Sequence, residues 1–284
     1  DLVRSRGLGD VYKRQEILLL EEKAKKVRRL IIKEIATIGT GHVGGSLSAA
    51  DALVLLYNKV MNIDVNNPRM EGRDRFVLSK GHAGAGLYAV LCEKGYITEE
   101  TLYTLNQNNT TLPSHCDMNK VNGIDMTTGS LGQGFSAAVG MALAAKIAKE
   151  DAYIYTMVGD GECQEGQIWE AALAATSFKL NNLIGFVDYN KMQLDGPLSE
   201  IIEMSPMDKK WEAFGWNTIE VDGHNMEEMY SAIMKAKECK DKPSMIVLNT
   251  IKGKGVKSIE AQGFKNHSMT LTEEIVKEAL EELK

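Results

Sequence analysis

The sequence predicts an α/β protein, a doubly wound parallel sheet with helices on both faces. Five short apolar segments have the length and composition of buried strands: residues 76–79, 152–158, 183–187, 217–221 and 245–250. Segments with helical periodicity separate them. Buried strands that alternate with helices are typical of parallel sheets, whose crossover helices cover both faces.

Composition restricts the class of protein. With 44% hydrophobic and 25% charged residues over 284 positions, the chain is an ordinary globular protein, long enough to bury a large core. A net charge of −6 without a long basic block argues against nucleic acid as a partner. No apolar run reaches the ~20 residues of a membrane span. Four widely spaced cysteines without a C-x-x-C pair indicate reduced thiols in the cytoplasm.

We expect one domain, from residue 16 to residue 284. Residues 1–15 have neither the apolar core of a signal peptide nor clear periodicity. We interpret them as a disordered remnant of gene assembly or expression and exclude them from the fold. Residues 16–38 then form the first helix of the domain, with an apolar stripe on one side.

Two polar side chains follow neighbouring strands in the middle of the chain. Asp160 lies just after the strand predicted at 152–158, and Asn190 just after the strand predicted at 183–187. If the strands are parallel neighbours, both side chains overhang the crevice where ligands bind in open α/β sheets. Their oxygen atoms suit Mg²⁺ or Ca²⁺, and two protein ligands are few enough that the ion should be shared with a phosphate. Gly161 would let the backbone approach that phosphate. Taken alone, Gly-Asp-Gly is more often only a turn, and the following Asn in its strand–helix–strand context favours the ligand site.

Three histidines lie in loops rich in glycine or polar residues. His42 lies among glycines and is either a functional side chain or a helix cap; nearby, Ser48 and Asp51 form a capping-box pattern that predicts a helix from residue 49. His82 follows a predicted strand. His115 lies in a polar loop at 106–125, which is long enough to suggest a function, although the residue taken alone is equally a loop histidine.

Two further glycine-rich segments, the second of which carries a histidine, complete the pattern. Gly129-Ser130-Leu131 opens a small-residue helix, but no strand precedes it, so a dinucleotide-binding fingerprint is unconvincing. A glycine-rich loop from residue 252 onward carries His267. We interpret His224, in VDGHN, as structural.

Together these motifs resemble the transketolase family. GDG followed about 30 residues later by Asn is the thiamine diphosphate (ThDP) fingerprint, and GDGECQEGQIWEAA with DYNKMQLDG is similar to its transketolase version. RDRFVLSKGH, GHVGGS and GSLGQG occur in the family's order. The resemblance runs from about residue 16 to residue 267 and covers the diphosphate-binding half of a transketolase.

The resemblance implies roles for individual residues. Asp160, Asn190 and the carbonyl of Met192 would hold Mg²⁺ (or Ca²⁺) against the diphosphate. The implied cofactor-binding residues are His82, Gly129, Ser130, Leu131, Gly161, Asn190, Leu194 and His267. The implied catalytic residues are His42, His115 and His267 around the substrate, with Glu165 as a carboxylate between two cofactor sites.

The sequence departs from the family pattern at three loops. Val43 replaces a common proline after His42, which should alter loop stiffness. LPSHCD, with Ser114 and Cys116, replaces LPGHPD around His115, and NHSMT replaces the commoner HG at His267. We expect these changes to affect loop geometry.

The implied activity is transfer of a two-carbon ketol unit from a ketose to an aldose, with phosphorylated sugars of the pentose phosphate pathway as expected substrates. The implied partner is a C-terminal transketolase subunit that carries the pyrimidine-binding half, in an α2β2 heterotetramer. One alternative is the alpha subunit of a 2-oxoacid dehydrogenase, although RDRFVLSKGH and GHxGGS together are not expected there. The other is a non-catalytic ThDP-binding relic, against which the retained histidines argue.

Overall fold

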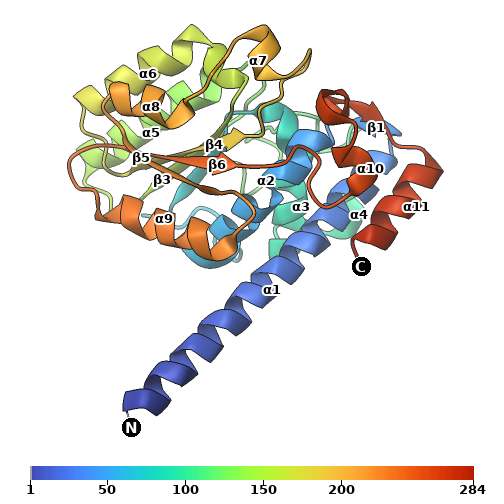
Figure 1. The fold of residues 1–284 in the computed structure, drawn as a ribbon, viewed down its shortest axis with the longest axis horizontal. Helices are drawn as coiled ribbons and strands as arrows, with labels where there is room; N and C mark the ends of the chain where they lie inside the picture. Colours follow the sequence, from blue (N-terminus) through green and yellow to red (C-terminus); the bar gives the residue numbers. More distant parts are fainter. Residues whose placement is uncertain (1) are drawn as a thin grey trace.

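The computed structural model describes residues 2–284, with side chains from residue 14 onward. Its centre is a five-stranded sheet with the strand order β2-β3-β4-β6-β5 (Figure 1). All four strand pairs are parallel, so the predicted sheet is confirmed. The strands are β2 (Arg75–Leu78), β3 (Ile154–Gly159), β4 (Leu183–Tyr189), β5 (Asn217–Asp222) and β6 (Ser244–Asn249).

Helices cover both faces of this sheet (Figure 1). On one face lie α5 (Gln133–Ala148), α6 (Gly166–Ser177) and α8 (Met207–Ala213). On the other lie α1 (Leu2–Ala36), α2 (Gly44–Leu55), α3 (Gly84–Lys94) and α9 (Met226–Glu238). From β2 to β3 to β4 the chain advances in one direction across the sheet, but from β5 to β6 it returns. Right-handed crossovers therefore put α9 on the face opposite to α5 and α6.

The strands bury both of their faces. In β4, Ile184 and Phe186 join the core beneath α1, α2, α3 and α9, whereas Leu183 and Val187 join the core beneath α5, α6 and α8. Successive side chains of a strand point to opposite faces, so a strand covered on both sides reads as a continuous apolar run. This explains why the sheet is recognisable in the sequence.

Shorter elements connect the layers, and the sequence analysis did not predict most of them. They are the helical segments η1 (Leu56–Val60), η2 (Gly81–Ala83), α4 (Glu99–Leu102), η3 (Glu162–Gln164), α7 (Leu198–Ile201), α10 (Lys257–Glu260), η4 (Gly263–His267) and α11 (Glu273–Glu282), and the strands β1 (Thr40–Gly41) and β7 (Met269–Thr270). β1 and β7 pair antiparallel, which joins the loop of His42 to the loop of His267.

Helix α1 begins within the segment that we set apart. The structure has residues 2–15 as the first turns of this helix, although the sequence analysis expected disorder there, and Figure 1 shows this part extending away from the rest of the protein. Among the side chains that the structure describes, from residue 14 onward, the first buried one in this helix is that of Leu20. The exclusion of residues 1–15 from the domain stays a prediction. Over the described residues, no helix combines the length and apolar character needed to cross a bilayer.

The capping-box prediction at Ser48 and Asp51 is wrong. Helix α2 begins at Gly44, so both residues lie within the helix, where their side chains are buried. Ser48 donates to Asp188 Oδ2 (2.6 Å), and Asp51 forms an ion pair with Arg28. The local sequence matches a capping box, but both side chains instead bind buried partners that are distant in sequence, Asp188 for Ser48 and Arg28 for Asp51.

Gly81→Ala should destabilise the protein because Gly81 packs against the backbone of another loop. A Cβ at this position would lie 2.7 Å from the Gly129 nitrogen, so the two loops would have to separate. We expect urea denaturation to show a loss of about 1–3 kcal/mol. The matched control is Gly140→Ala in α5, where nothing lies within 4 Å of the added Cβ. It should leave stability unchanged or raise it by up to about 1 kcal/mol. Equal stability of the Gly81 variant and the parent would contradict the close approach.

Candidate active site

Asp160 and Asn190 meet at the carboxyl edge of the sheet, as the sequence predicted. They follow β3 and β4, whose last paired residues include Gly159 and Asp188. The Asp160 carboxylate accepts hydrogen bonds from the backbone amides of Gly161 (2.8 Å) and Lys191. Asn190 Oδ1 accepts from the Met192 amide (3.1 Å). The loop after β4 therefore folds back over the end of β3.

Asp160 is a buried carboxylate, and the partners that the structure gives it are backbone amides. Its side chain is 2% exposed. Burial, and after it the nearby Asp188 carboxylate, raise the pKa of Asp160 to about 7, although the two amides and Lys80 act in the opposite direction. Such a group is stabilised by a positive charge brought to it. This is the environment expected of a cation ligand.

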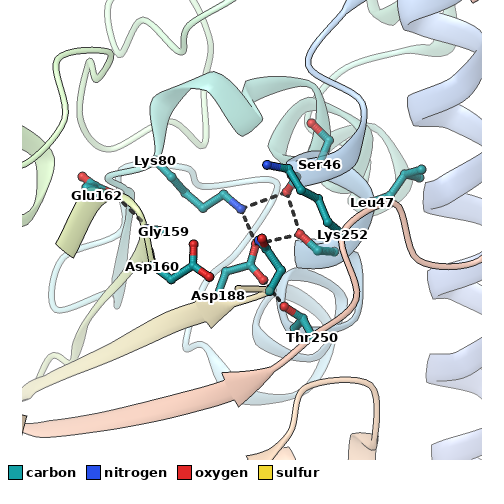
Figure 2. Close-up of polar contacts among 12 residues, drawn as sticks. Ser46, Leu47, Lys80, Gly159, Asp160, Glu162, Asp188, Thr250 and Lys252 are labelled. Carbon is teal, nitrogen blue, oxygen red and sulfur yellow. Dashed lines mark hydrogen bonds and ion pairs between the residues drawn. The ribbon is translucent and has the colours of Figure 1, made fainter. Parts of the chain in front are cut away.

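A buried ion pair forms the floor of the site. Lys80 and Asp188 are both almost fully buried, and the Lys80 ammonium contacts Asp188 Oδ2 and the Gly45 carbonyl (3.0 Å) (Figure 2). The hydroxyl groups of Ser48 and Thr250 also donate to the Asp188 carboxylate. Burial acts to raise the pKa of Asp188, but Lys80 and the two hydroxyls outweigh it and hold the pKa below its ordinary value. Asp188 therefore stays ionised.

A second buried ammonium, that of Lys252, contacts the loop after β4. Lys252 Nζ donates to the carbonyls of Met192 (3.1 Å) and Gln193 (3.3 Å) and lies 3.1 Å from His267 Nδ1. Burial, and after it Lys80, lower the pKa of Lys252 to about 8, although the carboxylates of Asp160 and Asp188 act in the opposite direction. The Met192 carbonyl, predicted from the resemblance to be a metal ligand, thus already contacts a cation of the protein itself.

Four histidines gather beside this edge of the sheet. The ring centroid of His42 lies 5.6 Å from that of His82, 5.9 Å from that of His115 and 5.5 Å from that of His267. His82 and His267 stack at 4.8 Å. The structure therefore brings together the four loop histidines that the sequence analysis selected.

Burial and neighbouring cations keep three of these imidazoles neutral. Burial is the largest cause for each. It lowers the pKa of His42 and of His82, with Lys80 as the next cause for His82. The pKa of His267 falls to about 3, because Lys252 and His42 add to the effect of burial. Neutral imidazoles can accept a proton or orient a hydroxyl near neutral pH.

A cavity of about 250 Å³ joins these groups. Predicted site residues that line it are His82, Gly129, Leu131, Asp160, Gly161, Glu165, Asn190, Met192, Leu194 and His267. His42 and His115 adjoin it through their ring contacts, and Ser130 lies in the loop before α5. Leu194 and Glu165 are exposed in the single chain, and the implied position of Glu165 between two cofactor sites stays a prediction. The functional roles of these residues stay predictions.

The sequence analysis missed several polar residues of the site, among them Glu162. Its buried carboxylate accepts from the amides of Gly132 (2.9 Å) and Gly159 (3.0 Å) and from the Ser79 hydroxyl. It therefore ties the loop of residues 129–131 to the end of β3. Burial raises the pKa of Glu162, although the donated hydrogen bonds oppose this. The sequence analysis also missed Lys80, Asp188 and Lys252. Each is a charged residue inside or shortly after an apolar strand, and this position could have indicated a buried charge at the site.

His224 has the structural role that we predicted. Its Nδ1 lies 2.7 Å from Asp51 Oδ2, and its Nε2 accepts from the Ile251 amide (2.9 Å). Over the described residues, no group of three or more His, Cys, Asp or Glu side chains is arranged to hold a metal ion. The predicted cation site needs no such group, since it consists of a carboxylate, an amide oxygen and a carbonyl.

The departures from the family pattern are accommodated by packing. Val43 is fully buried, and Cys116 is 1% exposed. The Ser114 amide donates to Asn106 Oδ1 (2.8 Å), and the Ser114 carbonyl oxygen lies 2.7 Å from where a Cβ on Gly84 would be. The loop that carries His115 is therefore held on both sides of the histidine.

Comparison with known proteins agrees with this site. Residues 20–283 match the family described as transketolase, thiamine diphosphate binding domain. The chain is 55% identical to the 6-deoxy-6-sulfo-D-fructose transketolase subunit SqwG of Clostridium sp. (strain MSTE9), over 93% of this chain and 96% of that one. It is 37% identical to one subunit of the apulose-4-phosphate transketolase of Phocaeicola vulgatus, over 91% of this chain and 92% of that one.

Solved transketolases have the same fold. Those of Leishmania mexicana and Campylobacter jejuni each match with a TM-score of 0.88, at 32% and 33% identity. The alignments cover 93% and 94% of this chain but 41% and 43% of those chains. Fold and site thus define a thiamine diphosphate-binding α/β domain. The chain belongs to the transketolase family, in the group whose thiamine diphosphate-binding part is a separate subunit. The 2-oxoacid dehydrogenase alternative is therefore wrong.

His267→Asn should remove part of the acid sensitivity of the protein. The pKa of His267 is about 3 in the folded chain, against an ordinary value of 6.5. Between these values the unfolded chain binds a proton that the folded chain does not, so the free energy of unfolding falls as pH drops below about 6.5. The contribution should be smaller than the limit of about 1.4 kcal/mol per pH unit, because solvent screens a partly exposed ring.

The measurement is urea denaturation of parent and variant at several pH values from 7.5 to 5. We expect the stability difference between them to change with pH in the stated direction. A difference that stays constant over this range would contradict the neutral state of His267.

Proposed function

We propose that this chain is the diphosphate-binding subunit of a two-subunit transketolase, which moves a two-carbon ketol unit from a ketose to an aldose. The supporting observation is the cluster of four histidines beside the buried carboxylate of Asp160, at the carboxyl edge of the sheet. When bound, thiamine diphosphate supplies the electron sink for cleaving a carbon–carbon bond next to a carbonyl. The residues of this chain bind it, orient the sugar and move protons.

Asp160, Asn190 and the Met192 carbonyl would hold Mg²⁺ or Ca²⁺ against the diphosphate. The fit rests on the buried Asp160 carboxylate, whose pKa is raised to about 7 by burial and by Asp188, and on the carbonyl that already contacts an ammonium. Oxygen ligands of this kind are the ones that these ions prefer. The groups assigned to the diphosphate and the thiazolium ring are those of Gly129, Ser130, Leu131, Gly161, His82, His267 and Leu194.

The histidines that are not assigned to the cofactor alone are positioned to contact the sugar substrate. His42 lies at the centre of the cluster, between His115, His82 and His267. We assign His42, His115 and His267 to the substrate hydroxyls, where neutral imidazoles hold or accept a proton. We assign Glu165 to the contact with a second protein chain, because it is exposed at the rim of the cavity.

The substrate is proposed to be a ketose with an anionic group at its far end. The relatives named above are transketolases of a sulfonated sugar and of a phosphorylated sugar. Because the relative at 55% identity belongs to the sulfosugar transketolase, 6-deoxy-6-sulfo-D-fructose is the first donor to test. Our expectation of a pentose phosphate pathway role requires that pentose phosphates are also turned over. The proposed location is the cytoplasm, in line with the free cysteines.

We propose a C-terminal subunit with the pyrimidine-binding half as partner, in a heterotetramer of two copies of each chain. Two apolar side chains that line the cavity, Leu131 and Leu194, are exposed, which supports a covered surface there. An α2β2 assembly would follow from the two-fold symmetry that most oligomers adopt.

Asp160→Ala should abolish Mg²⁺-dependent binding of thiamine diphosphate, because the diphosphate would lose its shared cation. Asn190→Ala should weaken binding less, since it removes a neutral ligand. Titration calorimetry of thiamine diphosphate with and without Mg²⁺ measures both effects. His42→Ala is the control, because a group that acts on the sugar should leave cofactor affinity unchanged. Parent-like affinity in Asp160→Ala would refute the cation site.

The purified chain should not turn over ketose by itself. In the family, a glutamate of the pyrimidine-binding half promotes the proton transfer that activates the cofactor. The described elements of this chain form one parallel sheet and the helices that cover it, which correspond to the diphosphate-binding half. Steady-state ketol transfer should be measured with thiamine diphosphate and Mg²⁺, first without and then with a candidate C-terminal subunit. Full activity of the lone chain would refute the proposal that two different chains are needed. Cofactor binding without turnover in the presence of the partner would instead favour the non-catalytic relic.

A further inference from the structure

His224 makes two hydrogen bonds that fix its tautomer. It lies in the turn between β5 and α9, outside the histidine cluster, and its side chain is 10% exposed. Because Nε2 accepts from the Ile251 amide (2.9 Å), that nitrogen carries no proton. The proton is therefore on Nδ1, which donates to Asp51 Oδ2 (2.7 Å).

Asp51 is itself held in place. It lies within α2, where both of its oxygens accept from the Arg28 guanidinium of α1. Burial acts to raise the pKa of Asp51, but Arg28 and His224 outweigh it and keep the carboxylate ionised. The imidazole of His224 is thus attached to a buried ion pair between two helices of the core.

On its other side, the His224 ring connects to the candidate active site through Ile251 and Lys252. Ile251, whose amide donates to His224, directly precedes Lys252, and the Lys252 ammonium donates to the Met192 carbonyl (3.1 Å). The backbone that follows the Lys252 side chain, on its C-terminal side, is held by two other hydrogen bonds. The Lys252 carbonyl accepts from Asn266 Nδ2 (3.1 Å), and the Gly253 amide donates to the Gly44 carbonyl (3.0 Å). On the near side, the Ile251 amide is held by His224, and Thr250 before it donates to the Tyr189 carbonyl and to Asp188.

We propose that His224 is a positioning residue for the cofactor site, which acts through the Ile251 amide on Lys252 and through Lys252 on the Met192 carbonyl. Losing this hydrogen bond would remove the support of the residue directly before Lys252, so that Thr250 would become the nearest anchored residue on that side. The contact of the Lys252 ammonium with the Met192 carbonyl would be held less firmly as a result. This inference rests on the proposed function. It assigns to His224 more than support of the turn, since support of the turn would require only that the ring packs and contacts Asp51.

Two substitutions separate the two contacts of the ring. Gln places its amide oxygen near the position of Nε2, so His224→Gln can still accept from the Ile251 amide but loses the donor to Asp51. Asn places its amide nitrogen near the position of Nδ1, so His224→Asn keeps the donor to Asp51 and loses the acceptor for Ile251. The matched control is Asn225→Ala, which removes the N-cap of α9 beside His224 without touching Ile251.

The first measurement is the affinity of the chain for thiamine diphosphate in saturating Mg²⁺, by titration calorimetry. We expect His224→Asn to weaken binding by about 10- to 100-fold, as is usual when a group supporting a metal ligand is lost. His224→Gln should stay within about threefold of the parent, and Asn225→Ala should bind like the parent even if it unfolds more easily. The second measurement is hydrogen exchange of the Ile251 amide, which should be fast in His224→Asn and protected in His224→Gln.

The outcomes distinguish this inference from the proposed function. If the parent does not bind thiamine diphosphate at all, the proposed function fails, and Ile251 exchange still decides whether His224 holds the loop. If the parent binds and all variants bind equally, the positioning role is refuted while the proposed function stands. Affinity that follows thermal stability across the variants, with Asn225→Ala as weak as His224→Asn, would refute it as well.

Discussion

The ion pair between Lys80 and Asp188 connects the parts of the chain on which the site depends. Asp188 lies near the end of β4 in the middle of the sheet, Lys80 follows β2, and the hydroxyls that complete the carboxylate come from α2 and from the end of β6. Figure 2 shows Lys80 and Thr250 beside Asp188. A buried pair of this kind contributes little net stability, but removing one partner leaves an unpaired buried charge. The strand ends and α2 are thereby held in one relative position.

The electrostatics of the site follow from this arrangement. Two buried carboxylates, Asp160 and Asp188, and two buried ammoniums, Lys80 and Lys252, lie at the same edge of the sheet. Lys80 forms its ion pair with Asp188. Within the part of the chain that the structure describes, the charges of Asp160 and Lys252 are therefore not balanced by an ion pair of their own. Burial, the largest cause for both groups, raises the pKa of Asp160 and lowers that of Lys252. A cation shared with a diphosphate would satisfy the first, and the phosphate charge would stabilise the second, so the chain is arranged for a charged cofactor.

The histidine cluster depends on close backbone contacts between loops. The β1–β7 pair aligns Gly41 with Met269 and so places His42 beside His267. Gly44 lies against Asn266, where a Cβ would come within 2.0 Å of Asn266 Oδ1. The loops meet at distances that only glycine allows. This explains the glycine-rich composition around His42 without a phosphate contact at every glycine.

By itself, the sequence determined the five strands, the order of strands and helices, and the position of Asp160 and Asn190 at strand ends. These features depend on patterns within a few residues, and the resemblance to transketolases added the roles of the histidines. The tertiary structure decided which distant groups meet. It placed Lys252 on the Met192 carbonyl and Glu162 on the glycine loop, and it turned Ser48 and Asp51 from an expected helix cap into buried partners of Asp188 and Arg28. These contacts join residues about 20 to 140 positions apart, and local periodicity carries no information about such pairs; they arise when packing buries polar groups that must then find partners.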